Sequence, residues 1–312
     1  MVRRWGPAGW TAVALLTVLA AVAIDPGLRH DVVFDSPVLF LISWGPMLLG
    51  GVVAWALVKA FGNRAELDRR IAAAMQTHPI NRELGWLLLF LVGFVLCMGG
   101  LGTILHLFGE EIGADLAMSA SLVSRLLFLF TLPLLVMDRS GVVLDGRGTA
   151  MPAIALKVEQ PWRWLGLIPV ALVLGLVGYI YLLVPGSGLP EPSFPLVGFV
   201  LAFALISVCE EIFFRGMVQT RLEIIMGPWG GIVATSILFS LMYAIVRPYD
   251  AVSQIPGDGL VYDLGLALLT YGTASLLYGY LWLCFRNTWL NVLLRIGIFF
   301  ILTPPALKNG MM

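Results

Sequence analysis

The sequence predicts an all-α protein, a polytopic bundle of transmembrane helices with about nine spans. Two properties of its 312 residues carry this prediction: 59% are hydrophobic and only 12% are charged, and the apolar residues form long runs. A soluble domain carries about 25% charged residues, and a disordered chain is poorer in apolar residues. The 19 Lys and Arg residues are balanced by 19 Asp and Glu residues. Without a basic excess, nucleic acid is not an expected partner.

Nine apolar runs approach or exceed the length of about 20 residues that a helix needs to cross a bilayer. They cover 8–24, 37–61, 84–107, 117–137, 163–184, 195–220, 229–246, 260–285 and 288–303. The first run also has features of a signal peptide, with Arg3 and Arg4 before it and Ala21-Val22-Ala23 at its end. A retained first helix and a cleaved leader therefore both remain open.

The cations are distributed unevenly between the two sets of loops that nine spans create. Fourteen of the 19 lie in the loops on the side of the N-terminus or in the part of a span next to those loops, three lie on the opposite side, and Arg125 and Arg295 lie deep inside spans. The positive-inside rule then places the N-terminus in the cytoplasm. We expect an integral membrane protein in contact with membrane lipid, in a bacterial-type inner membrane.

The polar segment 138–162 is rich in glycine and proline and is the best candidate for a boundary within the chain. We predict an N-terminal four-helix membrane region over 1–150 and a C-terminal five-helix core over 151–312. The three cysteines lie in separate apolar runs without C-x-x-C spacing. Neither a disulfide framework nor a thiolate metal site is expected.

Ionisable side chains inside a membrane span are costly, so they indicate a functional site. Away from the ends of the predicted spans there are five of them, Arg125, Glu210, Glu211, Arg215 and Arg295, while Asp263 is close to a span end. Glu211 stands four residues before Arg215, the favourable order for an ion pair on a helix. We expect this pair to be fixed and Glu210 to be the freer carboxylate, available as a general base. The alternative is a structural pair, with Glu210 reaching a polar cavity or another cation.

The run from Glu210 to Gly216, Glu-Glu-Ile-Phe-Phe-Arg-Gly, resembles the first motif of the CPBP family. This family comprises type II CAAX prenyl endopeptidases and bacteriocin-processing or immunity proteins. Phe239–Tyr243 resembles the family's F-x-x-x-H motif, and 279–294 resembles the run before its last motif, H-x-x-x-N. The resemblance covers about 195–303. It implies a multi-helix intramembrane protein and, in active members, peptide hydrolysis that depends on glutamate or on a metal.

Both histidines of the family's motifs are replaced in this chain. Tyr243 stands where F-x-x-x-H ends, Arg295 stands at the last histidine, and Phe299 stands at the expected asparagine. Arginine stays protonated, so it neither shuttles a proton nor binds a divalent metal. With no nitrogen ligands left in the membrane, no metal or other cofactor is expected.

The resemblance assigns candidate roles if catalysis persists. Glu210 would be the general base, Glu211 and Arg215 its orienting pair, and Arg295 with Tyr243 the donors to an oxyanion. Counting 1.5 Å per residue along each helix places Glu210, Tyr243, Arg295 and also Arg125 in one layer near the middle of the membrane. Depth does not determine rotation, so contact among them is a question for the structure.

Two functions of different classes follow from these residues. The first is a CAAX prenyl endopeptidase-like intramembrane protein with reduced or lost catalysis. The second is a non-catalytic membrane protein of the same fold, in which a Glu–Arg network holds the helices and the bundle binds lipid or a membrane-embedded peptide or protein. A transporter subunit is a weaker third hypothesis, because the chain shows no internal repeat.

Overall fold

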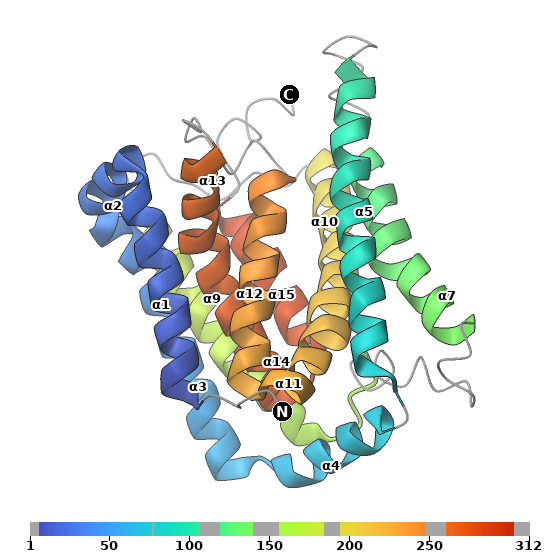
Figure 1. The fold of residues 1–312 in the computed structure, drawn as a ribbon. Coiled ribbons are helices and arrows are strands. Elements are labelled where there is room, and N and C mark those ends of the chain that lie inside the picture. Colours follow the sequence, from blue (N-terminus) through green and yellow to red (C-terminus); the bar gives the residue numbers. More distant parts are fainter. Residues whose placement is uncertain are drawn as a thin grey trace.

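The computed structural model describes residues 6–76, 78–106, 119–139, 156–183, 194–246 and 260–302. Every regular element within these ranges is a helix, and most of the helices stand side by side along one direction (Figure 1). The predicted all-α bundle is therefore confirmed. The boundary expected near residue 150 falls in 140–155, outside the described residues, and the division into two regions stays a prediction.

Within the described ranges, seven helices are long and apolar enough to cross a membrane. They are Pro7–Ile24, Ile80–Leu101, Ser119–Val136, Pro161–Leu182, Leu196–Met226, Pro228–Ile245 and Val261–Phe285. An eighth crossing is present if α3 (Gly45–Phe61) is taken together with the start of α4 (Arg64–Met75), which is bent away from it by 95°. The run predicted over 288–303 forms α15 (Thr288–Ile301), a shorter apolar helix of 14 residues. Each predicted span thus contains a helix, although two are shorter than expected.

The centre of the bundle is built from the C-terminal half of the chain. Its elements are α10 (Phe194–Glu211), the π-helix η5 (Ile212–Gln219), α11 (Thr220–Met226), α12 (Pro228–Ile245), α13 (Leu260–Ala267), the π-helix η6 (Leu268–Gly272), α14 (Thr273–Phe285) and α15. The largest core cluster joins Phe213 and Phe214 of η5 to Phe239 of α12 and to Leu87 and Phe94 of a third element, α5 (Ile80–His106). The motif helix is therefore enclosed on several sides.

The remaining helices surround this centre. They are α1 (Pro7–Ile24), α2 (Pro26–Leu39), the π-helix η1 (Phe40–Trp44), α3, α5, the π-helix η2 (Leu126–Thr131), α7 (Leu132–Arg139), the 3-10 helix η4 (Pro161–Gly166) and α9 (Leu167–Leu182). Helix α1 packs on α12 and α13 but has no buried residue. Helix α3 packs on α9 and α14, whereas α5 and η2 pack on η5. Segments far apart in the sequence are thus neighbours in space.

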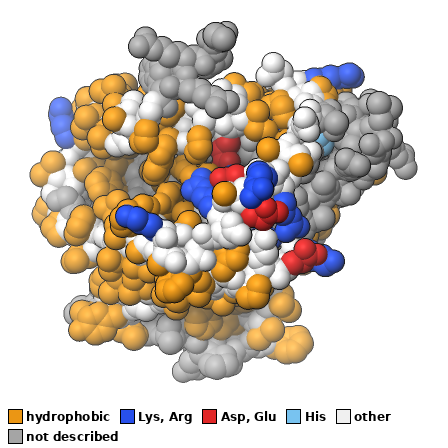
Figure 2. Space-filling model, turned by 90° about the horizontal axis from the view of Figure 1, so that it is seen from below, with side chains coloured by type: hydrophobic (Ala, Val, Ile, Leu, Met, Phe, Trp, Pro, Cys, Tyr) orange, Lys and Arg blue, Asp and Glu red, His pale blue; other side chains and the backbone are white. Residues whose placement is uncertain are grey.

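Helix α4 lies across one end of the bundle (Figure 1). Leu67, Ile71 and Met75 recur every four residues, so they share one face of the helix. That face is buried against Trp282 of α14 and Trp162 of η4. Seen from this end, charged side chains gather near the middle of the surface and hydrophobic ones surround them (Figure 2). This is the end that the charge distribution predicts to be cytoplasmic, and α4 closes part of it.

Candidate functional site

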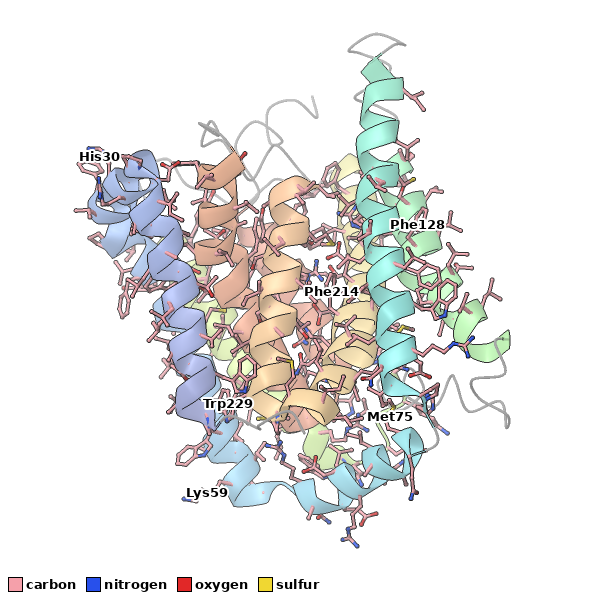
Figure 3. The ribbon with its side chains drawn as sticks, in the orientation of Figure 1. His30, Lys59, Met75, Phe128, Phe214 and Trp229 are labelled. Atoms are coloured by element: carbon pink, nitrogen blue, oxygen red, sulfur yellow. The ribbon has the colours of Figure 1, made fainter. Side chains whose placement is uncertain are left out.

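The motif carboxylates lie at the junction of α10 and η5. Glu210 and Glu211 are the last two residues of α10, and all eight residues of η5 are buried. π-helical segments are rare and are frequent at functional sites. Phe214, labelled in Figure 3, lies within the bundle, between the ends marked by His30 and by Lys59 and Met75. The motif is thus deep inside the protein, as its predicted depth in the membrane requires.

Glu210 is held by three side chains from three different helical segments. Its Oε1 accepts a hydrogen bond from Nε of Arg125 at 2.6 Å, and its Oε2 accepts one from the hydroxyl of Tyr243 at 2.6 Å. Nη2 of Arg295 donates a second hydrogen bond to Oε2. The expectation that Glu210 would be the freer carboxylate is wrong, because two arginines from separate spans converge on it.

Glu211 contacts a different set of partners. Its Oε1 accepts from Nη1 of Arg295 at 3.1 Å, and its Oε2 accepts from the amide of Asn291 at 2.8 Å. Arg215 lies at the expected position, with Nε 3.4 Å from Oε2. The sequence therefore predicted the Glu211–Arg215 pair, but the closer contacts of Glu211 come from α15. Arg295 touches both carboxylates and joins the two halves of the network.

The point at which α15 begins determines where Arg295 lies along the helix. The side chain of Asn287 accepts a hydrogen bond from the backbone N–H of Trp289 at 3.1 Å and caps the helix. Asn291 and Arg295 follow at intervals of four residues, so they share the face that meets the carboxylates. Phe299 continues this face, and its ring stacks on Phe203 with a centroid distance of 4.2 Å. The position expected to hold asparagine is thus part of an aromatic contact.

Aromatic rings line the cationic groups of the network. The guanidinium of Arg215 lies 5.4 Å from the ring centroid of Phe239 and 5.9 Å from that of Tyr278. The guanidinium of Arg295 also lies 5.4 Å from the Phe239 ring. The quadrupole of an aromatic ring attracts a cation that lies over its face, so these contacts stabilise the buried guanidinium groups. Phe239, the first residue of the F-x-x-x-H-like run, therefore supports two arginines, while Tyr243 at the end of the same run binds Glu210.

Two members of the network were not assigned to it from the sequence. Arg125 was recognised as a cation inside a span, but its direction was unknown; Asn291 was not singled out. Asn291 also donates to the carbonyl oxygen of Tyr278 at 3.0 Å, which ties α15 to α14. The signal that could have identified it is an amide one helical turn before Arg295 in an otherwise apolar run.

A second group of ion pairs lies closer to α4. Nε of Arg221 donates to Glu83 at 2.6 Å, and Nδ1 of His78 is 2.7 Å from the other oxygen of that carboxylate. Arg286, whose backbone φ of 48° ends α14, forms an ion pair with Glu223. These contacts fasten α5, α11 and the end of α14 together.

The network does not fit a divalent metal. Both carboxylates are turned toward guanidinium groups, and a metal cation there would meet three arginines. Within the described residues, no group of three or more His, Cys, Asp and Glu side chains has the geometry to hold a metal ion.

The comparison with protein families agrees with the motif geometry. The family model described as "Type II CAAX prenyl endopeptidase Rce1-like" matches residues 192–301. This segment is Rce1-like. The resemblance to the CPBP family seen in the sequence is confirmed over these residues, which are CAAX protease-like, and the apolar helices make the chain an integral membrane protein. No curated protein and no solved structure matches the chain.

The Rce1-like segment contains most of the network but not all of it. Glu210, Glu211, Arg215 and Arg295 lie within 192–301, as do Tyr243 and Asn291. Arg125 lies outside that segment and supplies a guanidinium to Glu210 from the span Ser119–Val136. The polar centre of the Rce1-like segment is thus completed by a helix from the preceding part of the chain.

Proposed function

We propose that this protein is a CAAX prenyl endopeptidase-like intramembrane protein in which peptide hydrolysis is strongly reduced or lost, and in which the motif residues hold the helices together. The observation that supports this proposal most directly is that both carboxylate oxygens of Glu210 already accept hydrogen bonds from other side chains. A general base must turn an oxygen toward the water that it activates. Both oxygens of Glu210 instead accept hydrogen bonds from Arg125, Tyr243 and Arg295.

The other two residues at motif positions are also poorly suited to proton transfer. Arg295 carries only donors and stays protonated, so it has no lone pair with which to accept a proton. The Tyr243 hydroxyl uses its one proton in the hydrogen bond to Glu210. An active alternative would need Arg295 and Tyr243 to face an oxyanion. Both groups face Glu210 instead, which favours the structural role.

Lipid and a membrane-embedded peptide or protein are the proposed partners. Helix α10 presents Val197, Leu201 and Leu205 at intervals of four residues, each more than half exposed. Helix α3 presents Leu48, Val52 and Trp55 in a similar way. Apolar stripes of this length suit the acyl chains of a bilayer or an apolar partner helix. We place the protein in a bacterial-type inner membrane with its N-terminus in the cytoplasm, on the basis of its charge distribution.

A hydrolysis assay tests the proposal. The purified full chain in lipid vesicles would be mixed with a fluorogenic peptide that carries a prenylated C-terminal cysteine motif. We expect no cleavage above that of the Glu210→Gln variant, while the same substitution lowers the melting temperature. Glu223→Gln, which removes a carboxylate outside the network, is the matched control. Cleavage by the wild type and by Glu223→Gln, but not by Glu210→Gln, would show that the protein is an active protease.

A further inference from the structure

The buried network contains more positive than negative charge. It holds the guanidinium groups of Arg125, Arg215 and Arg295 but only the carboxylates of Glu210 and Glu211. Four of these residues are fully buried, and Arg295 is 5% exposed. Among the described residues, no third acidic side chain pairs with any of the three arginines. One uncompensated charge in an apolar interior is strongly unfavourable, so the charge balance favours the binding of one anion.

Arg215 is the arginine with the fewest satisfied donors. Its Nη2 donates to the Ser275 hydroxyl at 2.7 Å, but its Nε and Nη1 are buried without a hydrogen-bond acceptor. The Nε–Glu211 contact of 3.4 Å is an ion pair only. Arg125, by comparison, leaves only Nη2 without an acceptor. A buried N–H without an acceptor is costly, and a ligand with acceptor atoms would remove that cost.

Unfilled space lies next to Arg215 in the chain. Gly216 is buried in η5, yet a Cβ built on it would lie more than 4 Å from every atom other than those of its two chain neighbours and the nearby backbone of its own helix. Other buried glycines of the same core are tightly enclosed: a Cβ at Gly231 would lie 2.5 Å from Glu223, and one at Gly279 would lie 2.9 Å from Gln219. The core is therefore incompletely packed in the turn that carries the least satisfied guanidinium.

We propose that the network binds one small monovalent anion, a halide or a carboxylate group, at Arg215 beside Gly216. The anion would balance the single excess charge and accept hydrogen bonds from Nη1 and Nε. This inference goes beyond the proposed function and does not depend on whether the protein hydrolyses peptides, because anion binding and cleavage have separate readouts.

Thermal unfolding of the purified full chain tests the site without any substitution. Sodium chloride or sodium acetate would replace sodium gluconate, a salt of a bulky anion, at constant sodium concentration and ionic strength. We expect a saturable rise in Tm of about 2–4 °C. A rise with chloride alone identifies a halide site, and a rise with acetate identifies a site that takes carboxylates. The absence of a rise with both salts would overturn the proposal.

Three variants locate the effect. Arg215→Gln removes the excess charge and should abolish the anion-dependent rise. Gly216→Val fills the space and keeps every charge, and it should also abolish the anion-dependent rise. If Arg215→Gln does not fold, Gly216→Val alone tests whether the anion binds beside residue 216. Arg221→Gln, in the second group of ion pairs, should lower Tm but keep the rise. An undiminished rise in Gly216→Val or Arg215→Gln would show that the anion binds elsewhere and that the proposal is wrong.

Discussion

Arg295 is the residue that connects the two motif carboxylates. It donates to Glu211 at 3.1 Å, to the Tyr243 hydroxyl at 2.6 Å, and to Glu210. A histidine at this position could hold or release a proton, whereas arginine supplies a permanent charge and several donors. The exchange therefore converts a position suited to proton transfer into one suited to fastening α15 against α10.

Loss of this connection should destabilise the protein strongly. We expect Arg295→Gln to lower the free energy of unfolding by about 3–5 kcal/mol, because it leaves buried carboxylates without their shared partner. Arg64→Gln is the matched control. Arg64 pairs with Asp68 at 3.4 Å on the exposed face of α4, and such a pair contributes about 0.3–0.5 kcal/mol. Unfolding of the purified variants in detergent measures both, and equal effects would contradict the fastening role.

Sequence reasoning at the level of residues identified which groups lie in the membrane but not how they face. Glu210, Glu211 and Arg215 were recognisable from their motif, and Tyr243 and Arg295 from their positions relative to it. The bond from Arg125 to Glu210 depends on the rotation of the span that carries Arg125, which an apolar sequence does not specify. Hydrophobic periodicity is weak evidence of rotation when lipid and core are both apolar.

Helices α11 and α12 form a tight hairpin around the motif. Gly227, with φ of +87°, ends α11, and Pro228 begins α12. A left-handed residue at this position suits glycine, and proline is well tolerated in the first turn of a helix. A short distance into α12, Gly231 allows the backbones to approach closely: a Cβ there would lie 2.8 Å from the backbone N of Glu223. Small residues permit such contacts between membrane helices.

Substitution at this crossing should separate the two helices. We expect Gly231→Ala to destabilise the protein by about 1–3 kcal/mol, as overpacking does in a closely packed core. The backbone of α11 cannot move aside as a flexible side chain can. Gly198→Ala in α10, where a Cβ would meet nothing within 4 Å, should have no such cost. A Tm for Gly231→Ala as high as that for Gly198→Ala would exclude close backbone packing at the crossing.

Most elements were predictable because each long apolar run has few alternatives to a helix in a bilayer. Helix α4 lies outside these runs, in the polar segment 62–83. The run 37–61 was predicted as one span, but its first residues belong to α2 and η1 and its membrane helix is α3. Apolar composition does not reveal where one helix ends and the next begins, since both are equally apolar.

At the scale of the whole molecule, the N-terminal region takes part in the motif centre. Helices α5 and η2 pack on η5, and α3 packs on α14. The order of helices in the sequence does not predict these neighbours, because short polar connections allow several arrangements of the same spans. Arg125 provides the polar part of this interface through its 2.6 Å bond to Glu210. The Rce1-like segment is thus stabilised by a residue that its family model does not include.

A double-mutant cycle measures that coupling between the two parts of the chain. We expect Arg125→Gln and Glu210→Gln each to destabilise the protein, and the double variant to lose less than the sum of the two losses by about 0.5–3 kcal/mol. The reason is that the second substitution removes a charge whose partner is already absent.

Arg125→Gln combined with Glu223→Gln is the control, since Glu223 lies about 20 Å further along the span that carries Glu210. That pair should be additive in the free energy of unfolding. Additivity in the Arg125 and Glu210 pair as well would mean that the N-terminal region stabilises the Rce1-like segment through apolar packing alone.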